Sequence, residues 1–309
     1  MTWDDFQTLK IGIGTWSWGD RLIWSYGSTH DKDDLREAFQ ASFDSGIQLF
    51  DTSEAFGQGL SEKLLGEFAQ ELPQFHNLKI ASKFMDYPWR FTPKSFTKAL
   101  NQSLARLQQK QIFLYQIHYP HSFFALPALL DAIADAYQSG LIMNVGVVNF
   151  DTKQIQTVYE PLRSRGIPLV SNQIEYNLLN RRCEQTGLLE ICESLNIRII
   201  ACSPLAMGLL TGKYSEEAMP PGLRGLKYPH SKIITIKPLV KLMRKIAVVH
   251  DGVCLAQVAI NWLISKQVIP IPGVKNRDQV LLDLAALTWQ LEEDEIRELD
   301  EISAEINES

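Results

Sequence analysis

Short apolar runs alternate with amphipathic stretches along almost the whole chain. The runs have the length of buried strands, and the stretches between them carry apolar residues at helical spacing. This alternation is typical of βα units that build a parallel sheet. Eight strands are predicted, at Lys10–Thr15, Gln48–Asp51, Leu78–Lys83, Ile112–His118, Met143–Val148, Leu169–Ile174, Ile197–Cys202 and Val268–Ile271.

The amphipathic stretches have recognisable helix signals. Leu35, Phe39 and Phe43 fall one helical turn apart, and Gly46 follows where a left-handed C-terminal cap is expected. Helices are predicted at Asp31–Ser45, Ser61–Glu71, Pro93–Leu107, Leu126–Ser139, Thr152–Arg165, Glu184–Leu195, Pro238–His250, Cys254–Lys266, Arg277–Ala286 and Glu292–Ile306. Eight strands with intervening helices predict an α/β fold of the (β/α)₈ TIM-barrel type, with residues 1–309 as a single domain.

A doubly wound sheet is the rival fold, because Gly12 and Gly14 follow the first apolar run. The third glycine of a dinucleotide fingerprint is missing, however, and no helix begins there to receive a pyrophosphate. Gly12 and Gly14 are therefore only weak evidence for a doubly wound sheet.

The segment from Ser203 to Lys237 breaks the alternation. It is rich in proline and glycine, and neither a helix nor a strand is predicted in it. A loop of this length in a compact domain usually has a function. Because it follows the seventh strand, it should lie over the C-terminal face of the barrel, where the active sites of such barrels are built.

Polar side chains follow six consecutive predicted strands. A residue at the C-terminal end of a barrel strand points into the mouth of the barrel. One interpretation is that Asp51 and Lys83 form an ion pair with a purely structural role and that His118 is an ordinary hydrogen-bonded histidine. The whole set favours a site, since buried charges are costly unless they are paired. Its members are Asp51, Lys83, His118, Asn149, Gln173 and Ser203.

Composition and charge exclude several classes of protein. The 309 residues are 45% apolar and 21% charged, as in an ordinary soluble globular protein, and the net charge of −6 without a long basic cluster argues against nucleic-acid binding. The four cysteines lack metal-type spacing, and His118 with His121 has no further ligand, so no metal site is predicted. Apolar runs too short for a membrane and an acidic N-terminus indicate a reducing, cytoplasmic location.

Several motifs in one order resemble the aldo-keto reductases. They are FDTSEAFG from residue 50, ASKF from 81, QIHYP from 116, VGVVNF from 145, SNQIEYN from 171, SPLAMGLLTGKY from 203 and IPIPGVKN from 269. The resemblance covers essentially the whole chain and is strongest to bacterial and plant-plastid members. It implies an NADPH-dependent oxidoreductase that reduces an aldehyde or ketone by hydride transfer, with the long loop after the seventh strand covering the cofactor.

The resemblance also assigns catalytic positions. Asp51, Lys83 and His118 match the family's aspartate, lysine and histidine, while Phe56 stands where the family has the tyrosine that donates a proton. Phenylalanine can neither donate nor accept a proton, so activity is expected to be impaired. Phe56 can be a native divergence or an engineered replacement. The channel beta subunits of the family suggest the alternative of an NADPH-binding regulatory or interaction protein, and reduction of carbon–carbon double bonds is a third possibility.

The cofactor residues carry over from the family in the same way. Val148 and Cys202 depart from the family's usual serine and aromatic residue, and Asp283 replaces an asparagine at the adenine end. Lys275 offers a cation for a 2′-phosphate, which favours NADPH over NADH. The cofactor-binding residues implied are Thr15, Trp16, Asp51, Asn149, Gln173, Ser203, Leu205, Gly208, Lys213, Arg224, Gly273, Lys275, Gln279 and Asp283.

Aromatic residues follow the first, third and fourth predicted strands and could line the mouth. They are Trp16, Trp18, Trp24, Phe84, Tyr87, Trp89, Tyr119, Phe123 and Phe124. The expected partner is therefore a small, apolar or aromatic carbonyl compound. Tyr26 and Tyr87 could replace the missing hydroxyl, whereas strand alternation is expected to point Tyr119 away from the mouth.

Overall fold

A single parallel sheet forms the centre of the computed structural model, which describes residues 6–72, 78–120 and 125–308. The sheet has eight strands in sequence order, β1 to β8, as the alternating pattern predicts. Consecutive strands are paired in parallel. The strands are β1 Ile13–Gly14, β2 Leu49–Asp51, β3 Lys79–Phe84, β4 Ile112–Ile117, β5 Ile142–Val148, β6 Leu169–Glu175, β7 Arg198–Cys202 and β8 Ile269–Pro270.

The sheet closes on itself between its first and last strands. The backbone N–H of Gly12 donates to the carbonyl of Pro270 at 3.0 Å, and that of Gly14 donates to Pro272 at 2.9 Å. A Cβ atom at Gly14 would lie only 2.9 Å from the carbonyl oxygen of Ile271. Glycine is thus required where the two strands meet, and Gly12 and Gly14 serve the closure of a barrel.

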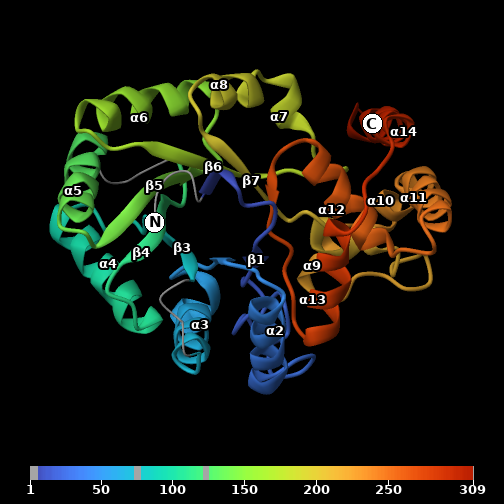
Figure 1. Ribbon diagram of the computed structural model, residues 1–309, viewed down its shortest axis with the longest axis horizontal. Helices are drawn as coiled ribbons and strands as arrows, with labels where there is room; N and C mark the ends of the chain where they lie inside the picture. The colour runs from blue at the N-terminus through green and yellow to red at the C-terminus, as the bar shows by residue number, and fades with distance from the viewer. Residues whose placement is uncertain (1–5, 73–77, 121–124, 309) are drawn as a thin grey trace.

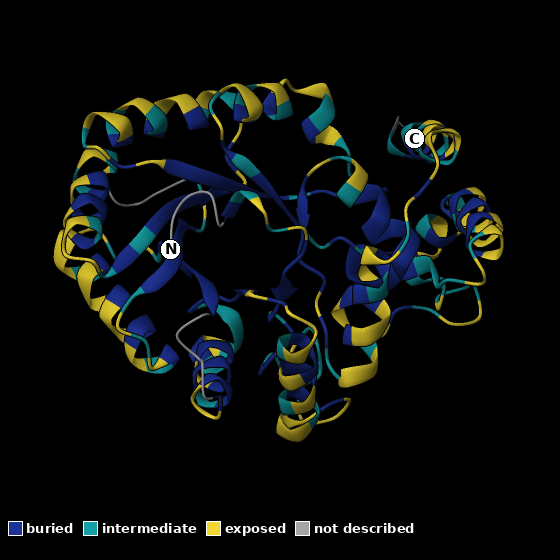
Figure 2. Cartoon of the chain, viewed as in Figure 1, coloured by how far each residue is buried: buried dark blue, intermediate teal, exposed yellow. Residues whose placement is uncertain are grey.

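Helices surround the strands on the outside of the barrel (Figure 1). Their outward faces are exposed, whereas the strands are buried (Figure 2). The helices are α2 Lys32–Asp44, α3 Leu60–Gln70, α4 Pro93–Leu107, α5 Leu126–Gln138, α6 Thr152–Ser164, α7 Arg182–Gln185, α8 Leu188–Ser194, α9 Leu223–Lys227, α10 His230–Thr235, α11 Lys237–Val249, α12 Leu255–Ser265, α13 Arg277–Leu284 and α14 Glu293–Glu308. No described helix is both long enough and apolar enough to cross a membrane.

The core has two parts on either side of the sheet. A small cluster that includes Leu114, Ile200 and Phe6 fills the inside of the barrel, and a much larger cluster joins the strands to the helices. Burying both faces in this way explains why the strands read as nearly continuous apolar runs.

Two predicted segments differ from the structure. The segment after β7 was expected to lack helices, but it contains the 3₁₀ helix η3 Ala206–Thr211 and the short helices α9 and α10. These helices are too short to show an apolar period, and left-handed residues inside η3 break it further. The helix predicted at Glu184–Leu195 is divided into α7 and α8, because Gly187 adopts a left-handed conformation between them.

Candidate active site

A buried ion pair joins the ends of β2 and β3. The Lys83 ammonium donates to Asp51 Oδ1 at 2.5 Å and to the carbonyl oxygen of Thr52 at 2.8 Å. The two charged side chains are 3% exposed or less. Pairing and hydrogen bonding allow both charges to persist away from water. The arrangement fixes one ammonium group at the mouth of the barrel.

Two glutamines hold the other carboxylate oxygen of Asp51. Gln173 Nε2 at the end of β6 donates to Asp51 Oδ2 at 2.8 Å, and Gln116 Nε2 on β4 donates to it at 3.2 Å. Gln116 Oε1 is buried without a hydrogen-bond partner. Asp51 is therefore bound from three other strands, which leaves its carboxylate no freedom to turn.

His118 follows β4 immediately and lies partly buried. Its Nδ1 lies 3.2 Å from Ser53 Oγ. Burial, and then the charge of Lys83, lowers the pKa of His118 to about 3. The imidazole is consequently neutral at physiological pH and is a poor proton donor there.

The Phe56 ring lies among these groups. It stacks on Trp16 with ring centroids 6.0 Å apart, and it meets His118 edge-on at 6.1 Å. The Lys83 Nζ atom lies 5.0 Å from the centroid of the Phe56 ring. An ammonium at this distance from an aromatic ring makes a favourable cation–π contact. Phe56 thus lies beside the charge of Lys83.

Tyr119 follows His118, two residues after β4 ends at Ile117. Its ring stacks on that of His118 with centroids 4.9 Å apart, and the residue lines a cavity between α5 and α6 with Leu126 and Phe150. The expectation that strand alternation directs Tyr119 away from the mouth stays a prediction. The predicted mouth residues Phe123 and Phe124, and His121, lie outside the described residues.

Three cations gather around the loop that follows β1. The Trp24 ring lies between the Arg224 guanidinium, 5.0 Å from its centroid, and the Lys275 ammonium, 5.2 Å from it. Burial, then Arg224 and then Lys213, lowers the pKa of Lys275 to about 8. Burial and then Arg224 also lower the pKa of Lys213. The three positive charges repel one another, so the cluster favours an anion.

This basic cluster has unused donors. Arg224 Nε and Trp24 Nε1 are buried without a hydrogen-bond partner. Among residues 6–72, 78–120 and 125–308, no carboxylate forms an ion pair with Lys213, Arg224 or Lys275. Arg224 is buried, Lys275 is partly buried and Lys213 is exposed, so the cost of a missing counter-ion falls chiefly on Arg224. A bound phosphate would relieve that cost.

The backbone near the strand ends adopts conformations that ordinary residues avoid. Asn149 after β5 has φ 57°, and Ser203 after β7 has φ 51°. Gly208 in η3 has φ 101°, and a Cβ there would lie 3.0 Å from Lys213 Cε. Strained backbone of this kind is concentrated at functional sites. Asn149 and Ser203 belong to the predicted set of strand-end residues, and Gly208 lies in the turn that follows Ser203.

Several predicted cofactor residues already have structural partners. Thr15 Oγ1 donates to the carbonyl oxygen of Asp51 at 3.0 Å. Gln279 Oε1 accepts from the backbone N–H of Lys275 at 2.9 Å, at the start of α13. Gly273 forms a bridge with Gly14 where the barrel closes, and Leu205 accepts backbone bonds inside the turn that leads to Gly208.

Asp283 lies on α13 and is almost completely buried. Burial raises the pKa of its carboxyl to about 8. The group is therefore largely protonated at neutral pH, and it can donate a hydrogen bond as an asparagine amide does. The replacement of asparagine by aspartate changes the chemistry of this position less than its formal charge suggests.

The model of the Aldo/keto reductase family matches residues 10–304 of this chain. The chain belongs to that family of oxidoreductases. It is 39% identical over 301 residues to a protein of Arabidopsis thaliana named pyridoxal reductase, chloroplastic, with 94% of this chain and 82% of the relative covered.

Solved structures have the same fold. The glycerol dehydrogenase from Gluconobacter oxydans superposes with a TM-score of 0.83 at 26% identity, over 96% of this chain and 91% of that one. An aldo/keto reductase from Klebsiella pneumoniae in complex with NADP and acetate superposes with a TM-score of 0.73 at 26% identity, over 95% of this chain and 91% of that one. The (β/α)₈ barrel predicted from the sequence is confirmed.

Sequence reasoning missed two contributors to the site. Gln116 has the same strand direction as Leu114 and His118, and this period of two could have revealed it. Ser53 contacts His118 from the loop after β2, and no periodic signal marks such a residue. Trp24 was predicted as an aromatic residue of the mouth, but its contacts with Arg224 and Lys275 were not predicted.

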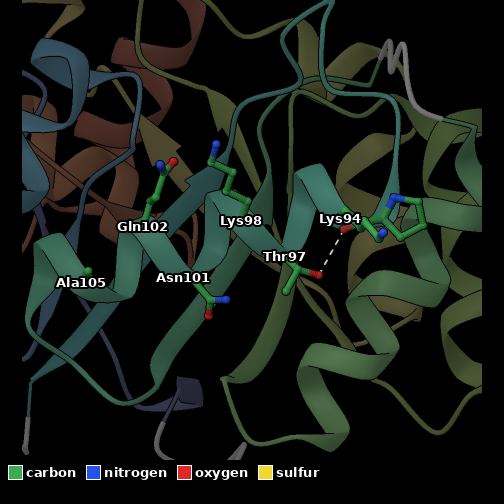
Figure 3. Close-up of a pocket in the computed structure, with 7 residues that line it drawn as sticks. Lys94, Thr97, Lys98, Asn101, Gln102 and Ala105 are labelled. Atoms are coloured by element: carbon green, nitrogen blue, oxygen red, sulfur yellow. Dashed lines mark hydrogen bonds between the residues drawn. The ribbon is translucent and has the colours of Figure 1, made fainter.

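A hollow on the outer face of α4 is unrelated to these groups. Figure 3 shows Lys94, Lys98 and Gln102 beside it, all on one helix, and Thr97 bonded back to Pro93 at 3.1 Å. None of the predicted site residues lines it. It serves below as a location for control substitutions.

Proposed function

We propose that this chain reduces aldehydes with NADPH as the electron donor. The observation that carries the proposal is the buried Lys83–Asp51 pair at the barrel mouth, in contact with Phe56 and near His118. A basic cluster with unused donors accompanies it at the same end of the strands. Membership in a reductase family supports combining the two features into one site.

The residues fit a nicotinamide dinucleotide with a 2′-phosphate. Lys275 and Arg224 would hold that phosphate, and Lys213 beside Gly208 would face the pyrophosphate with Ser203 and Leu205. The structural neighbour from Klebsiella pneumoniae in complex with NADP supports this assignment.

The other predicted cofactor residues would complete the site. Asn149 and Gln173 would hold the carboxamide of the nicotinamide, next to Thr15 and Trp16. At the adenosine end, Gly273 would allow the close approach of the ligand, and Asp283 would meet adenine beside Gln279. The cofactor, when bound, supplies hydride to the carbonyl carbon.

The chain's own residues act on the carbonyl oxygen. Lys83 presents a fixed positive charge that stabilises the negative charge which develops on that oxygen. Asp51 orients the ammonium, and Gln116 and Gln173 orient Asp51. Neutral His118 would contact the substrate oxygen through hydrogen bonding. Phe56 excludes water from the ammonium but contributes no proton.

Pyridoxal is the first substrate to test, because the relative from Arabidopsis thaliana carries the name pyridoxal reductase. Its aromatic ring suits a mouth that contains Trp16 and Phe56. Trp89 is 67% exposed and stacks on Tyr87, so an apolar surface continues beyond the site. We retain the cytoplasm as the proposed location.

The proposal is tested by titrating the protein with NADPH and with NADH while its tryptophan fluorescence is recorded. Trp16 and Trp24 lie at the site, so binding should quench the signal. Lys275→Met should weaken NADPH binding at least about tenfold, the effect of a lost charged hydrogen bond, and should leave NADH binding nearly unchanged. Lys98→Met on the outer face of α4 is the control and should alter neither.

Turnover is then measured as the loss of NADPH in the presence of pyridoxal and other aldehydes. Failure of NADPH to bind, or equal effects of Lys275→Met on both nucleotides, would contradict the cofactor assignment. A second function, an NADPH-occupied interaction protein, is favoured by the absence of a hydroxyl at Phe56. Binding of NADPH without any turnover, both in the native chain and in Phe56→Tyr, would support that function instead.

A further inference from the structure

The groups around Phe56 leave the developing alkoxide without an acidic proton. The ammonium of Lys83 is held by Asp51 and by the Thr52 carbonyl, and its positive charge is needed where it lies. His118 is neutral, because burial and Lys83 lower its pKa to about 3. The neutral imidazole N–H is far less acidic than a phenol. A reduction at this site therefore needs a proton source other than these two side chains.

Pyridoxal carries a proton donor of its own. A ring hydroxyl lies on the carbon next to the one that bears the aldehyde, so it can form an intramolecular hydrogen bond to the carbonyl oxygen through a six-membered ring. Such a bond polarises the carbonyl in the way that a tyrosine hydroxyl does. Groups held together within one molecule also react with high effective concentrations.

The Phe56 ring is suited to this arrangement. A hydroxyl at that position would compete with the substrate's hydroxyl for the same oxygen and would occupy space beside it. The apolar ring instead borders the oxygen position without offering a rival donor, while Lys83 Nζ at 5.0 Å from its centroid supplies the charge. Trp16 and His118 hold the ring in this place.

We propose that this chain is selective for aromatic aldehydes that bear a hydroxyl on the adjacent ring carbon, and that this hydroxyl donates the proton that Phe56 cannot. This inference rests on the proposed function. It makes Phe56 a residue that determines specificity, rather than a sign of lost activity.

The reaction balances with the reduced nicotinamide as the reductant. Hydride leaves the reduced nicotinamide, whose C–H bond breaks and which is oxidised by two electrons, and it forms a new C–H bond at the carbonyl carbon. The π electrons of the C=O bond move to oxygen. The O–H bond of the ring hydroxyl breaks, its proton passes to that oxygen, and its electron pair stays on the ring oxygen. The product is an alcohol with a ring phenolate, which then takes a proton from water. Lys83 stabilises the negative charge in both positions.

Three probe aldehydes separate this proton source from ordinary substrate preference. 2-Hydroxybenzaldehyde has a hydroxyl next to the aldehyde. 2-Methoxybenzaldehyde has an oxygen there without a transferable proton, and 3-hydroxybenzaldehyde has its hydroxyl too far from the carbonyl oxygen to bond to it. We expect the native chain to reduce the first at least about 100-fold faster, in kcat/KM, than the other two, after correction for their rates with borohydride. In Phe56→Tyr the advantage should shrink to about tenfold or less, because the introduced hydroxyl serves all three.

Among the described residues, Tyr119 is the tyrosine whose ring contacts His118, so it is a rival donor. The rings of Tyr26 and Tyr87 instead contact His30 and Trp89. Tyr119→Phe should keep the preference for 2-hydroxybenzaldehyde unchanged, and a collapse of the preference in that variant would assign the proton to Tyr119 and overturn the inference.

A second readout needs no turnover. With NADP⁺ present, the ionisation of bound 2-hydroxybenzaldehyde is followed by its absorbance. The bound hydroxyl should keep its proton at the pH of the turnover assay, and a substrate that is already ionised when bound at that pH would contradict the inference. If the native chain reduces 2-methoxybenzaldehyde as fast as 2-hydroxybenzaldehyde, the inference fails while the proposed function stands. If neither the native chain nor Phe56→Tyr reduces any aldehyde, the proposed function itself fails.

Discussion

Phe56→Tyr places a hydroxyl next to a fixed positive charge. Lys83 Nζ lies 5.0 Å from the centroid of the Phe56 ring, and Coulomb's law at an effective dielectric constant of about 20 gives about 3 kcal/mol of stabilisation for an anion at that distance. That energy corresponds to a pKa lowered by about two units. The Asp51 carboxylate on the same ammonium offsets part of it. The introduced hydroxyl should therefore be more acidic than an ordinary tyrosine.

A proton donor in this position should accelerate the reduction of aldehydes that lack an adjacent hydroxyl. General-acid catalysis contributes about 10²–10⁴-fold, equivalent to about 3–5 kcal/mol of barrier. We expect kcat for 2-methoxybenzaldehyde to rise at least about tenfold. If the introduced tyrosine ring keeps the position of the Phe56 ring, the rise should reach about 10²–10⁴-fold. The assay is the loss of NADPH under saturating aldehyde, with the dissociation constant of NADPH measured in parallel.

Two controls separate the hydroxyl from other effects of the substitution. Phe91→Tyr adds the same hydroxyl to a ring that is 62% exposed, and it should leave kcat unchanged. Phe56→Leu removes the ring without adding a donor and should give no gain. The reasoning is refuted if Phe56→Tyr binds NADPH as tightly as the native chain and gains nothing in kcat.

Three further predictions follow from the charges of the site. NADPH binding should weaken by about tenfold per pH unit above pH 8, because burial lowers the pKa of Lys275 to about 8 and the 2′-phosphate needs the charged form; NADH titrations should show no such slope. Asp283→Asn should raise the melting temperature more at pH 8.5 than at pH 5. The Asp283 carboxyl keeps its proton up to about pH 8 in the folded chain but releases it near pH 4 in the unfolded chain, so native stability falls as the pH rises between these values. Lys83→Met should cost about 3–5 kcal/mol in urea unfolding by leaving the Asp51 carboxylate unpaired, and Lys83→Met combined with Asp51→Leu should cost less.

The strands and the main site residues could be predicted because each reflects a local rule. Apolar runs mark the strands, and a polar residue directly after such a run lies at the barrel mouth, as Asp51, Lys83 and His118 do. The resemblance drew attention to Phe56, whose ring lies 5.0 Å from the Lys83 ammonium, and its correspondence to the family's tyrosine stays a prediction. These predictions needed no knowledge of how distant segments pack.

Contacts between distant segments could not be predicted in this way. The Trp24 ring contacts both Arg224 and Lys275, which lie 200 and 251 residues further along the chain, and only the closed barrel brings them together. The short helices α9 and α10 are set by packing and by proline positions rather than by an apolar period. The protonated state of Asp283 depends on burial, which the sequence pattern of α13 does not show.

Reduction of pyridoxal with NADPH is the measurement that tests the account most directly. The purified chain is incubated with both compounds, NADPH loss is followed by absorbance, and the alcohol is identified by mass. The account predicts one alcohol formed for each NADPH consumed, with turnover in the native chain despite Phe56. Tight NADPH binding with no alcohol formed, in the native chain and in Phe56→Tyr alike, would contradict it.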